Sequence, residues 1–228
     1  MSDTVLAGVG VQRGETAVLR DVTLAITGRT TAVIGENGSG KSTLIRILGG
    51  LTSASTGTVR VLGLDPARDI RGLRRRVAVV FSNPDAQIVM PTVEEDVAFS
   101  LRPDRLPPAE RDRRVAQALT RFGLAGIARR PSHELSGGQK QLLALCGAFV
   151  REPELVIADE PTAYLDARNA RQVADHLLAP GTHRLVMATH DLALAARCES
   201  AVLMHDGQVA TVGRPAEVIA RYEASLRC

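Results

Sequence analysis

The sequence predicts an α/β fold with a mostly parallel central sheet, an antiparallel β region near the N-terminus and a helical segment inserted into the α/β core. Short apolar runs such as 32–34 and 155–158 have the length of buried strands, and helical segments follow them. From residue 92 the pattern becomes purely helical before strands and helices alternate again. We therefore expect a single domain over 1–228, with a helical subdomain inserted at about 92–150.

Several segments before the insertion have strand character. Residues 5–11 alternate weakly with glycine and are expected to form an edge strand, whereas residues 22–26 alternate regularly. Residues 57–63 are expected to form another short strand between glycines. Residues 77–81 are continuously apolar, which is typical of a strand covered on both faces.

The inserted segment carries its own helix signals. Thr92 and Glu95 have the spacing of a capping box, which predicts a helix over 93–101. Prolines then end this helix and open the next one. The second helix places apolar residues at helical spacing, namely Val115, Leu119 and Phe122.

The α/β alternation resumes after Pro153. The expected elements are a strand over 155–158, a helix from Asp166 to 178, a strand over 185–188, a helix from Asp191 to 197, a hairpin turning at 205–207 and a terminal helix from Pro215.

Composition narrows the class of protein. The formal charge of +3 and the six aromatic residues, with no tryptophan, do not favour a nucleic-acid binder. The longest apolar run, 142–150, is far shorter than the ~20 residues of a membrane helix, and the N-terminus lacks a signal-peptide pattern. The three cysteines share no metal-ligand spacing and are expected to be free thiols in a reducing cytosol.

A glycine-rich loop at 35–43 fits the phosphate-binding pattern G-x-x-x-x-G-K-[ST] and lies between an expected strand and an expected helix. Backbone N–H groups in such a loop surround an anionic phosphate chain at the positive end of the helix. Lys41 can reach the β- and γ-phosphates, and the Ser42 hydroxyl can coordinate Mg²⁺. The other residues expected at the nucleotide are Asn37, Gly38, Ser39, Gly40 and Thr43.

Two carboxylates, Asp159 and Glu160, follow the buried strand at 155–158. In a phosphate-loop protein the first carboxylate serves Mg²⁺, usually through water. The second can orient or deprotonate the water that attacks the γ-phosphate. An Asp-Glu pair alone usually marks a surface turn. Here the pair follows a buried strand and lies downstream of a phosphate loop, and this context favours a role in catalysis.

Residues 135–139, Leu-Ser-Gly-Gly-Gln, place Ser136 as a helix N-cap and leave backbone donors open at a second helix start. This stretch resembles the signature of the ATP-binding-cassette (ABC) ATPases, a branch of the P-loop NTPases. With that resemblance, 35–43 looks like Walker A and 155–160 like Walker B. Residues 163–166, which end at Asp166, are similar to the D-loop, and His190 is similar to the switch histidine.

The resemblance implies a mechanism. Two copies would pack head to tail, with ATP between Walker A of one copy and Ser136, Gly137, Gly138 and Gln139 of the other. Glu160 would polarise the attacking water and His190 would contact the γ-phosphate. The implied cofactors are ATP and Mg²⁺.

Residues 81–99 resemble the energy-coupling-factor (ECF) ATPases, which power uptake of vitamins and transition-metal ions. This region would receive helices of a membrane-embedded coupling (T) subunit that works with a substrate-binding (S) subunit. Glu94, Glu95 and Asp96 would offer acidic partners to arginines there, although acids are also common in any first helical turn. The short C-terminal tail is more similar to biotin-transporter ATPases than to cobalt or nickel ones.

Two residues depart from the family pattern. Ser82 stands where the family usually has a glutamine that contacts Mg²⁺ and water. Because serine is shorter, we expect Ser82 to reach Mg²⁺ only through a bridging water, and Gln87 is the competing candidate for that role. No aromatic residue precedes Phe81, so the adenine-stacking residue is missing, and Arg13 could stack its guanidinium group instead.

These observations predict an ATP-hydrolysing subunit of an importer for a vitamin, with biotin favoured, or for a transition-metal ion. It would act as a dimer, peripheral to the cytoplasmic face of the membrane, and bind neither cargo nor nucleic acid. A homodimer is favoured, but a heterodimer with a related ATPase stays open. The alternatives are the ATPase of a conventional ABC importer and a soluble regulatory ABC protein switched by ATP.

Overall fold

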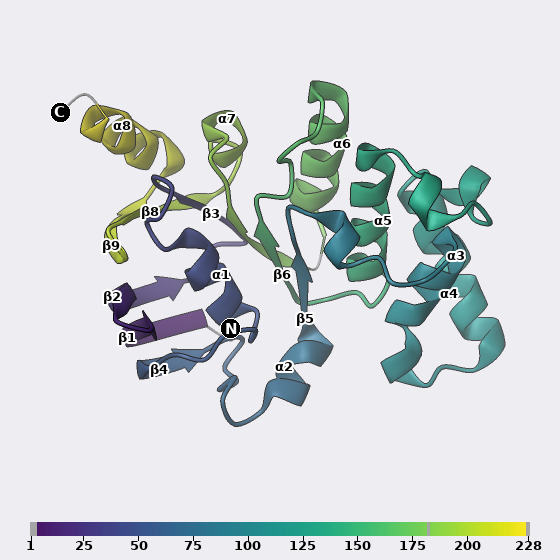
Figure 1. Cartoon of the computed structure of the whole chain (residues 1–228), viewed down its shortest axis with the longest axis horizontal. Coiled ribbons are helices and arrows are strands. Elements are labelled where there is room, and N and C mark those ends of the chain that lie inside the picture. Colours follow the sequence, from purple (N-terminus) through teal and green to yellow (C-terminus); the bar gives the residue numbers. More distant parts are fainter. Residues whose placement is uncertain (1–3, 182, 227–228) are drawn as a thin grey trace. The chain divides into compact units, whose positions relative to one another are not determined.

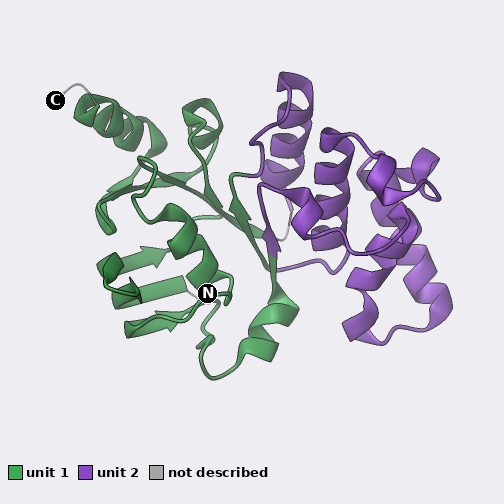
Figure 2. Ribbon diagram, viewed as in Figure 1, with its two compact units in different colours: residues 1–78, 154–160, 182–228 green, residues 79–153, 161–181 purple. Residues whose placement is uncertain are grey.

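The computed structural model describes residues 4–181 and 183–226 (Figure 1). The chain divides into two compact units (Figure 2). Unit 1 comprises residues 1–78, 154–160 and 182–228, and unit 2 comprises 79–153 and 161–181. The α/β fold with an antiparallel N-terminal sheet and a mostly parallel second sheet is confirmed.

The antiparallel sheet of unit 1 consists of β1 (Thr4–Arg13), β2 (Thr16–Ile26) and β4 (Thr56–Arg60) in the order β2-β1-β4. The expectation that residues 5–11 form an edge strand is wrong, because β1 pairs with β2 on one side and with β4 on the other. The edge-strand prediction rested on the glycines that interrupt the alternation of residues 5–11. One of them, Gly8, has a φ of 62° and lies where the β1 register shifts, so it marks an irregularity inside the sheet.

The second sheet has the order β5-β6-β7-β3-β8-β9. Its strands are β3 (Thr30–Ile34), β5 (Val77–Val80), β6 (Leu155–Asp159), β7 (Arg184–Ala188), β8 (Ser200–His205) and β9 (Gln208–Gly213). β3 pairs in parallel with β7 and β8, and β6 pairs in parallel with β7. All five residues of β3 and of β6 are buried, as their continuous apolar runs predict.

Four helices lie in the described part of unit 1. α1 (Lys41–Leu48) packs on β6 and β7, α7 (Leu192–Ala195) on β3, and α8 (Pro215–Ser225) on β8 and β9. α2 (Ile70–Arg76) ends at β5, where Arg76 forms a double hydrogen bond with the Glu154 carboxylate at 2.6 and 2.7 Å. α7 ends two residues before the expected position.

Unit 2 is built mainly from α3 (Val93–Ser100), α4 (Pro108–Arg121), α5 (Gly137–Phe149) and α6 (Ala167–Leu178). The expected capping box of Thr92 and Glu95 opens α3. α5 packs against the other three helices, and Phe122 lies between Phe149 and His176, with ring centroids 5.8 and 4.4 Å apart. Among the described residues, no helix is both long and apolar enough to cross a bilayer.

Candidate functional site

The glycine-rich loop joins β3 to α1 within unit 1 and needs its glycines for two reasons. Gly35, Gly38 and Gly40 have φ values of 144°, 83° and 98°, a region that side chains disfavour. A Cβ on Gly35 would also lie 2.2 Å from the Met204 carbonyl oxygen. The loop therefore follows a tight path that exposes its backbone at the start of α1.

Lys41 is the buried cation of this loop. Its ammonium group donates hydrogen bonds to the carbonyl oxygens of Gly35 at 2.7 Å and Glu36 at 2.8 Å. Burial lowers the pKa of Lys41, although Glu160, Asp159 and Glu36 act in the opposite direction. An anionic ligand in the loop would favour the charged form of this group.

Ser42, at the start of α1, donates its hydroxyl hydrogen to Oδ1 of Asp159 at 2.9 Å. Asp159 ends β6 and is buried, so the two predicted metal ligands meet within unit 1. A hydroxyl and a carboxylate are oxygen donors of the kind Mg²⁺ prefers. Ser39 Oγ is buried without a hydrogen-bond partner among the described residues, so its hydroxyl is free to donate to an anionic ligand in the loop.

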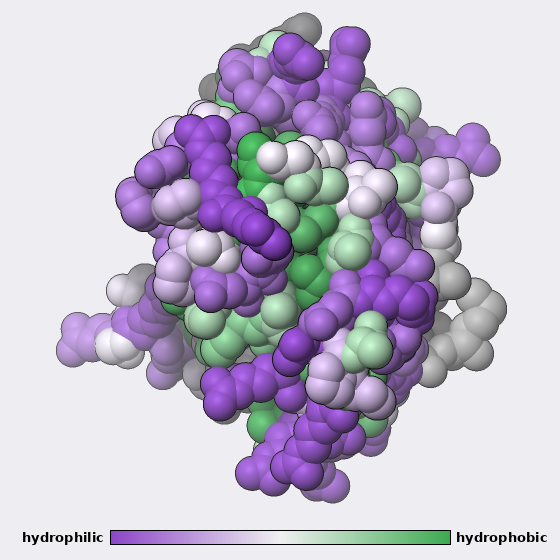
Figure 3. Space-filling view, turned by 90° about the vertical axis from the view of Figure 1, so that its right-hand side faces the viewer, coloured by the Kyte–Doolittle hydropathy of each residue, from purple (hydrophilic) through white to green (hydrophobic). Residues whose placement is uncertain are grey.

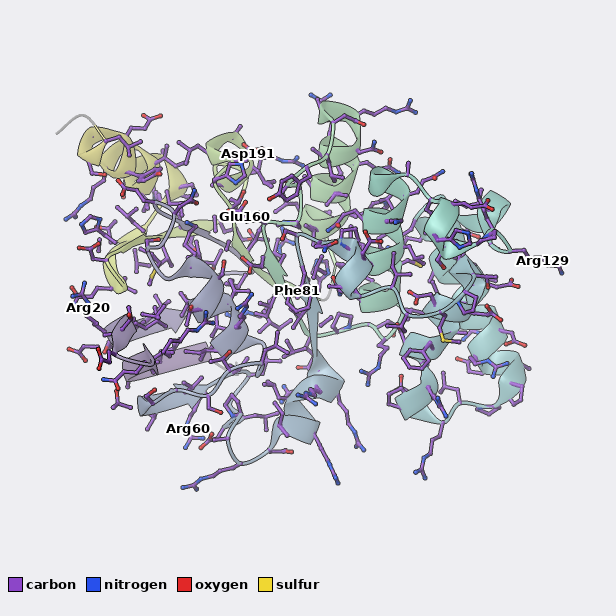
Figure 4. All side chains as sticks on the ribbon, in the orientation of Figure 1. Arg20, Arg60, Phe81, Arg129, Glu160 and Asp191 are labelled. Carbon is purple, nitrogen blue, oxygen red and sulfur yellow. The ribbon has the colours of Figure 1, made fainter. Side chains whose placement is uncertain are left out.

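Glu160 and His190 meet at the carboxyl ends of β6 and β7. Glu160 Oε2 lies 2.7 Å from His190 Nδ1 and accepts a hydrogen bond from His190 N at 3.2 Å. The backbone of Glu160 is left-handed, with φ of 50°, and its N–H group donates to the Ala188 carbonyl at 2.9 Å. Figure 4 shows Glu160 near Asp191, the residue after His190. A carboxylate in this place can accept a proton from water.

The Ser-Gly-Gly turn starts α5 in unit 2. Ser136 and Gln139 form a reciprocal capping box: Ser136 N donates to Gln139 Oε1 at 3.0 Å, and Gln139 N donates to Ser136 Oγ at 3.3 Å. The Gln139 side chain thus closes the helix start. Ser136 and Gly137 are exposed, so the first turn of α5 at Gly137 lies at the surface, while the Ser136 N–H group is used within the cap.

Asp166 starts α6 in the same unit. Its carboxylate accepts hydrogen bonds from the backbone and side-chain nitrogens of Asn169 at 2.9 and 2.6 Å. These hydrogen bonds lower the pKa of Asp166. Gly138 of α5 packs against Asn169, where a Cβ would lie 2.4 Å from the side chain, so the starts of α5 and α6 are neighbours.

The comparisons with known proteins identify the family. Residues 19–163 match the family model described as ABC transporter, which covers more than half of the chain. The chain belongs to the ABC transporter family. It is accordingly an ATP-binding subunit, an ATPase coupled to transport.

Three similar proteins place it more closely. The biotin transport ATP-binding protein BioM of Rhizobium etli is 42% identical, over 93% of this chain and 94% of BioM. The energy-coupling factor transporter ATP-binding protein EcfA1 of Latilactobacillus sakei is 40% identical, over 89% of this chain and 74% of EcfA1. The structure of cbiO1 from Clostridium perfringens, part of the ABC transporter complex cbiONQ, matches with a TM-score of 0.86 and 31% identity, over 98% of this chain and 93% of cbiO1. The predicted resemblance to ECF-type ATPases is thus confirmed.

In this ABC ATPase, Ser82 and Gln87 are the two candidates for the contact with Mg²⁺ and water, and the structure shows how the Gln87 side chain is held. Gln87 Oε1 accepts a hydrogen bond from Phe81 N at 2.8 Å, and its Nε2 donates to the Val79 carbonyl at 2.9 Å. Both ends of the Gln87 amide therefore bind the backbone that precedes it. The half-buried Ser82 hydroxyl takes part in no hydrogen bond of the described chain.

The three acids predicted to meet a membrane subunit differ in their surroundings. Asp96 is buried and accepts hydrogen bonds from the backbone N–H groups of Val89 at 2.8 Å and Met90 at 3.0 Å, so it does not offer a surface charge. Glu95 accepts hydrogen bonds from Thr92 in the capping box but stays exposed. The expectation that these acids meet arginines of a membrane subunit is therefore wrong for Asp96. For Glu94 and Glu95 it stays a prediction.

Arg13 ends β1 and is exposed, opposite Thr16 in the β1–β2 register. Its proposed stacking on adenine stays a prediction.

Sequence reasoning missed one link in unit 2. Lys140 Nζ donates to Asp85 Oδ1 at 2.7 Å, and Gln141 Nε2 donates to the Phe81 carbonyl at 3.1 Å. The sequence does single out Lys140, because Lys41 and Lys140 are its only two lysines, but it does not indicate Asp85 as the partner.

Proposed function

We propose that this protein is the ATP-hydrolysing subunit of an ECF-type importer and works as a head-to-tail homodimer on the cytoplasmic face of the membrane. The observation that carries this proposal is the contact between Glu160 Oε2 and His190 Nδ1 in the unit that also holds Lys41, Ser42 and Asp159. A carboxylate, a switchable imidazole and a phosphate loop are the groups that γ-phosphate hydrolysis requires.

Each residue has a defined part in that reaction. The loop N–H groups and Lys41 bind the phosphates. Ser42 and Asp159 would hold Mg²⁺, which neutralises charge on the phosphate oxygens when bound. Glu160 orients a water and accepts its proton as the water oxygen bonds to the γ-phosphorus and the bond to the β–γ bridging oxygen breaks. His190, held through Nδ1, presents Nε2 to the γ-phosphate.

The second half of the site would come from the other copy. Ser136, Gly137 and Gly138 of one subunit would close over the ATP bound to the phosphate loop of its partner. The exposed start of α5 at Gly137 supports this role, because a helix N-terminus favours anions. Opening after hydrolysis would then move the membrane subunits.

A groove in unit 2 suits the membrane partner. It measures about 350 Å³ and runs along α3 and α4. Figure 3 shows a hydrophobic strip between hydrophilic rims on this side of the molecule. Apolar residues of the groove include Ala98, Val115, Leu119 and Ala128, and its charged residues are Glu94, Glu95, Arg111 and Asp112. Three acids against one arginine favour an amphipathic helix with basic residues.

The cargo is proposed as a vitamin, with biotin favoured by the similarity to BioM over nearly the whole chain. A transition-metal ion is the alternative. Recognition of the cargo is assigned to a separate membrane subunit.

The test is purification of the tagged chain from membranes in mild detergent, followed by identification of the proteins that remain bound. We expect a coupling subunit and a small substrate-binding membrane protein to remain bound. The complex should hydrolyse ATP, and the Glu160→Gln variant of the complex should not. Recovery of the chain with soluble proteins alone would contradict the transport role. The cargo is identified by what the purified complex binds: bound biotin supports the vitamin, and a bound transition-metal ion supports the alternative.

A further inference from the structure

The turn between β8 and β9 contacts the phosphate loop within unit 1. It consists of Asp206 and Gly207, which are both left-handed, with φ values of 49° and 75°, as in the two-residue turns that match the twist of a hairpin. The Gly207 N–H group donates a hydrogen bond to the Ser39 carbonyl oxygen of the loop at 3.1 Å. A Cβ on Gly40 would lie 3.5 Å from Gly207 Cα, so the two backbones pass close to each other. The phosphate loop is therefore held by a turn that lies far from it in the sequence.

This hydrogen bond fixes the orientation of one peptide group of the loop. In a planar trans peptide the C=O and N–H groups point in opposite directions. Because the Ser39 oxygen is bound to the turn, the Gly40 N–H group of the same peptide is directed away from the turn. In the described chain this N–H group makes no hydrogen bond, and it directly precedes α1, whose N-terminus favours anions. The Gly40 N–H group is therefore free to donate to a bound phosphate.

Arg20 of β2 binds the same turn. Its backbone N–H group donates to the Gly207 carbonyl oxygen at 2.9 Å. Its guanidinium group donates from Nε to the Asp206 carbonyl oxygen at 3.0 Å, and Nη2 donates to the same oxygen. Hydrogen bonds from a charged donor are stronger than those between neutral groups. The Arg20 side chain thus restrains the turn whose N–H group holds the Ser39 carbonyl.

We propose that Arg20 is a positioning residue for the phosphates of the nucleotide. Its guanidinium group holds the turn at Asp206 and Gly207, the turn holds the Ser39 carbonyl, and the Gly40 N–H group faces the phosphates as a result. This inference rests on the phosphate-binding role that the proposed function gives to the loop. Without the guanidinium group the turn and the loop are less ordered before binding, and ordering them on binding lowers the affinity for the nucleotide.

The experiment measures affinity and turnover separately in the full chain. Titration calorimetry gives the dissociation constant for MgADP, and phosphate release gives turnover at saturating MgATP. We expect Arg20→Met to raise the dissociation constant about three- to tenfold, as for the loss of one hydrogen bond. Turnover should stay within about twofold, because the contacts of Lys41, Asp159 and Glu160 do not involve the turn. Arg20→Lys keeps a donor for the Asp206 carbonyl and should bind MgADP within about twofold of the wild type.

Arg60→Met is the matched control. Arg60 is also exposed, donates from its guanidinium group to the Gly63 carbonyl at 3.4 Å, and lies on β4, the opposite edge of the same antiparallel sheet (Figure 4). It should leave affinity and turnover unchanged. A wild type that binds MgADP no more tightly than Arg20→Met overturns the inference alone. Equal weakening in Arg60→Met, or no recovery in Arg20→Lys, also overturns it, because the effect is then not specific to the turn. A wild type that binds no MgADP overturns both this inference and the proposed function.

Discussion

Lys140 of α5 donates a hydrogen bond to Asp85 Oδ1 at 2.7 Å and thereby links this helix, which Ser136 caps, to the segment that follows β5. Gln141 adds a second tie through the Phe81 carbonyl, at 3.1 Å. α5 also packs on the 3₁₀ turn at Pro84–Ala86. These contacts lie within unit 2, and we expect a docking partner that displaces residues 81–87 to affect the start of α5 as well.

This pair gives the first prediction. The Lys140 and Asp85 side chains are 20% and 64% exposed, so Lys140→Met should lower the free energy of unfolding by only about 0.2–1 kcal/mol. Turnover of the isolated subunit should stay within about twofold, while stimulation by the membrane complex should fall severalfold. ATPase assays with and without the complex measure this ratio. The charge-exchanged pair Lys140→Asp with Asp85→Lys should restore stimulation, and normal stimulation in Lys140→Met would contradict the link.

The second prediction separates Ser82 from Gln87. Gln87→Ala should lower the free energy of unfolding by about 1–3 kcal/mol, because Phe81 N and the Val79 carbonyl lose their partner. Ser82→Gln should leave stability unchanged and raise ATP turnover by up to about tenfold, because a longer amide can reach the metal and water directly. Urea titration and steady-state turnover in the assembled transporter measure the two effects. Unchanged turnover in Ser82→Gln, together with a stable but inactive Gln87→Ala, would assign the contact to Gln87.

The third prediction concerns pH and Asp96. Burial raises the pKa of Asp96 above its ordinary 3.8, although the N–H groups of Val89 and Met90 oppose this. A raised pKa means that the folded chain binds the proton more tightly than the unfolded chain. The stabilisation it gives is therefore complete below pH 3.8 and is lost as the pH rises through the folded-state pKa.

Asp96→Asn removes the buried charge but retains an oxygen in place of Oδ1, which accepts both hydrogen bonds. We expect its stability relative to the wild type to increase between pH 4 and pH 7.5, by about 1.4 kcal/mol for each tenfold change in proton affinity. Asp96→Ala, the control, should be less stable than Asp96→Asn by about 1–3 kcal/mol at every pH because both N–H groups lose their acceptor. Parallel pH profiles for Asp96→Asn and the wild type would exclude the buried charge as the cause.

The fourth prediction tests Glu160. Glu160→Gln preserves the shape of the side chain but removes the basic oxygen, so turnover should fall about 10²–10⁴-fold. Binding of MgATP should be retained, and the ATP-bound dimer should accumulate. Phosphate release and nucleotide-binding assays check this, with Glu223→Gln on the exposed face of α8 as the control. Turnover at the wild-type rate in Glu160→Gln would remove Glu160 from the reaction.

The fifth prediction concerns the groove of α3 and α4. Glu94→Lys should weaken recovery of the membrane complex at moderate salt by severalfold and leave ATP binding intact, because it reverses a charge on the rim of the groove. Glu223→Lys makes the same charge change on α8 and should have no effect. The difference should narrow at raised ionic strength, which screens exposed charges. Equal recovery of the two variants at every salt concentration would exclude Glu94 as a docking residue.

Local chemistry determined most of the fold. The phosphate loop is recognisable because its glycines, lysine and serine act over a few neighbouring residues. The caps at Thr92, Ser136, Asp166 and Asp191 were predictable for the same reason, since each rests on a hydrogen bond between a side chain and the backbone three residues away. The strand that ends at Asp159 follows from a continuous apolar run.

Tertiary packing decided the contacts between residues far apart in sequence. The meeting of Glu160 with His190 depends on β6 and β7 lying side by side in parallel, which places their carboxyl ends together. The same holds for Lys140 with Asp85. It also holds for β1, which lies at the centre of its sheet because β4, 46 to 55 residues further along the chain, pairs with it. For the acids of α3, composition did not distinguish a surface charge from a buried one. Only the path of residues 88–90 turns the backbone N–H groups toward Asp96 and buries it, whereas Glu94 stays at the groove.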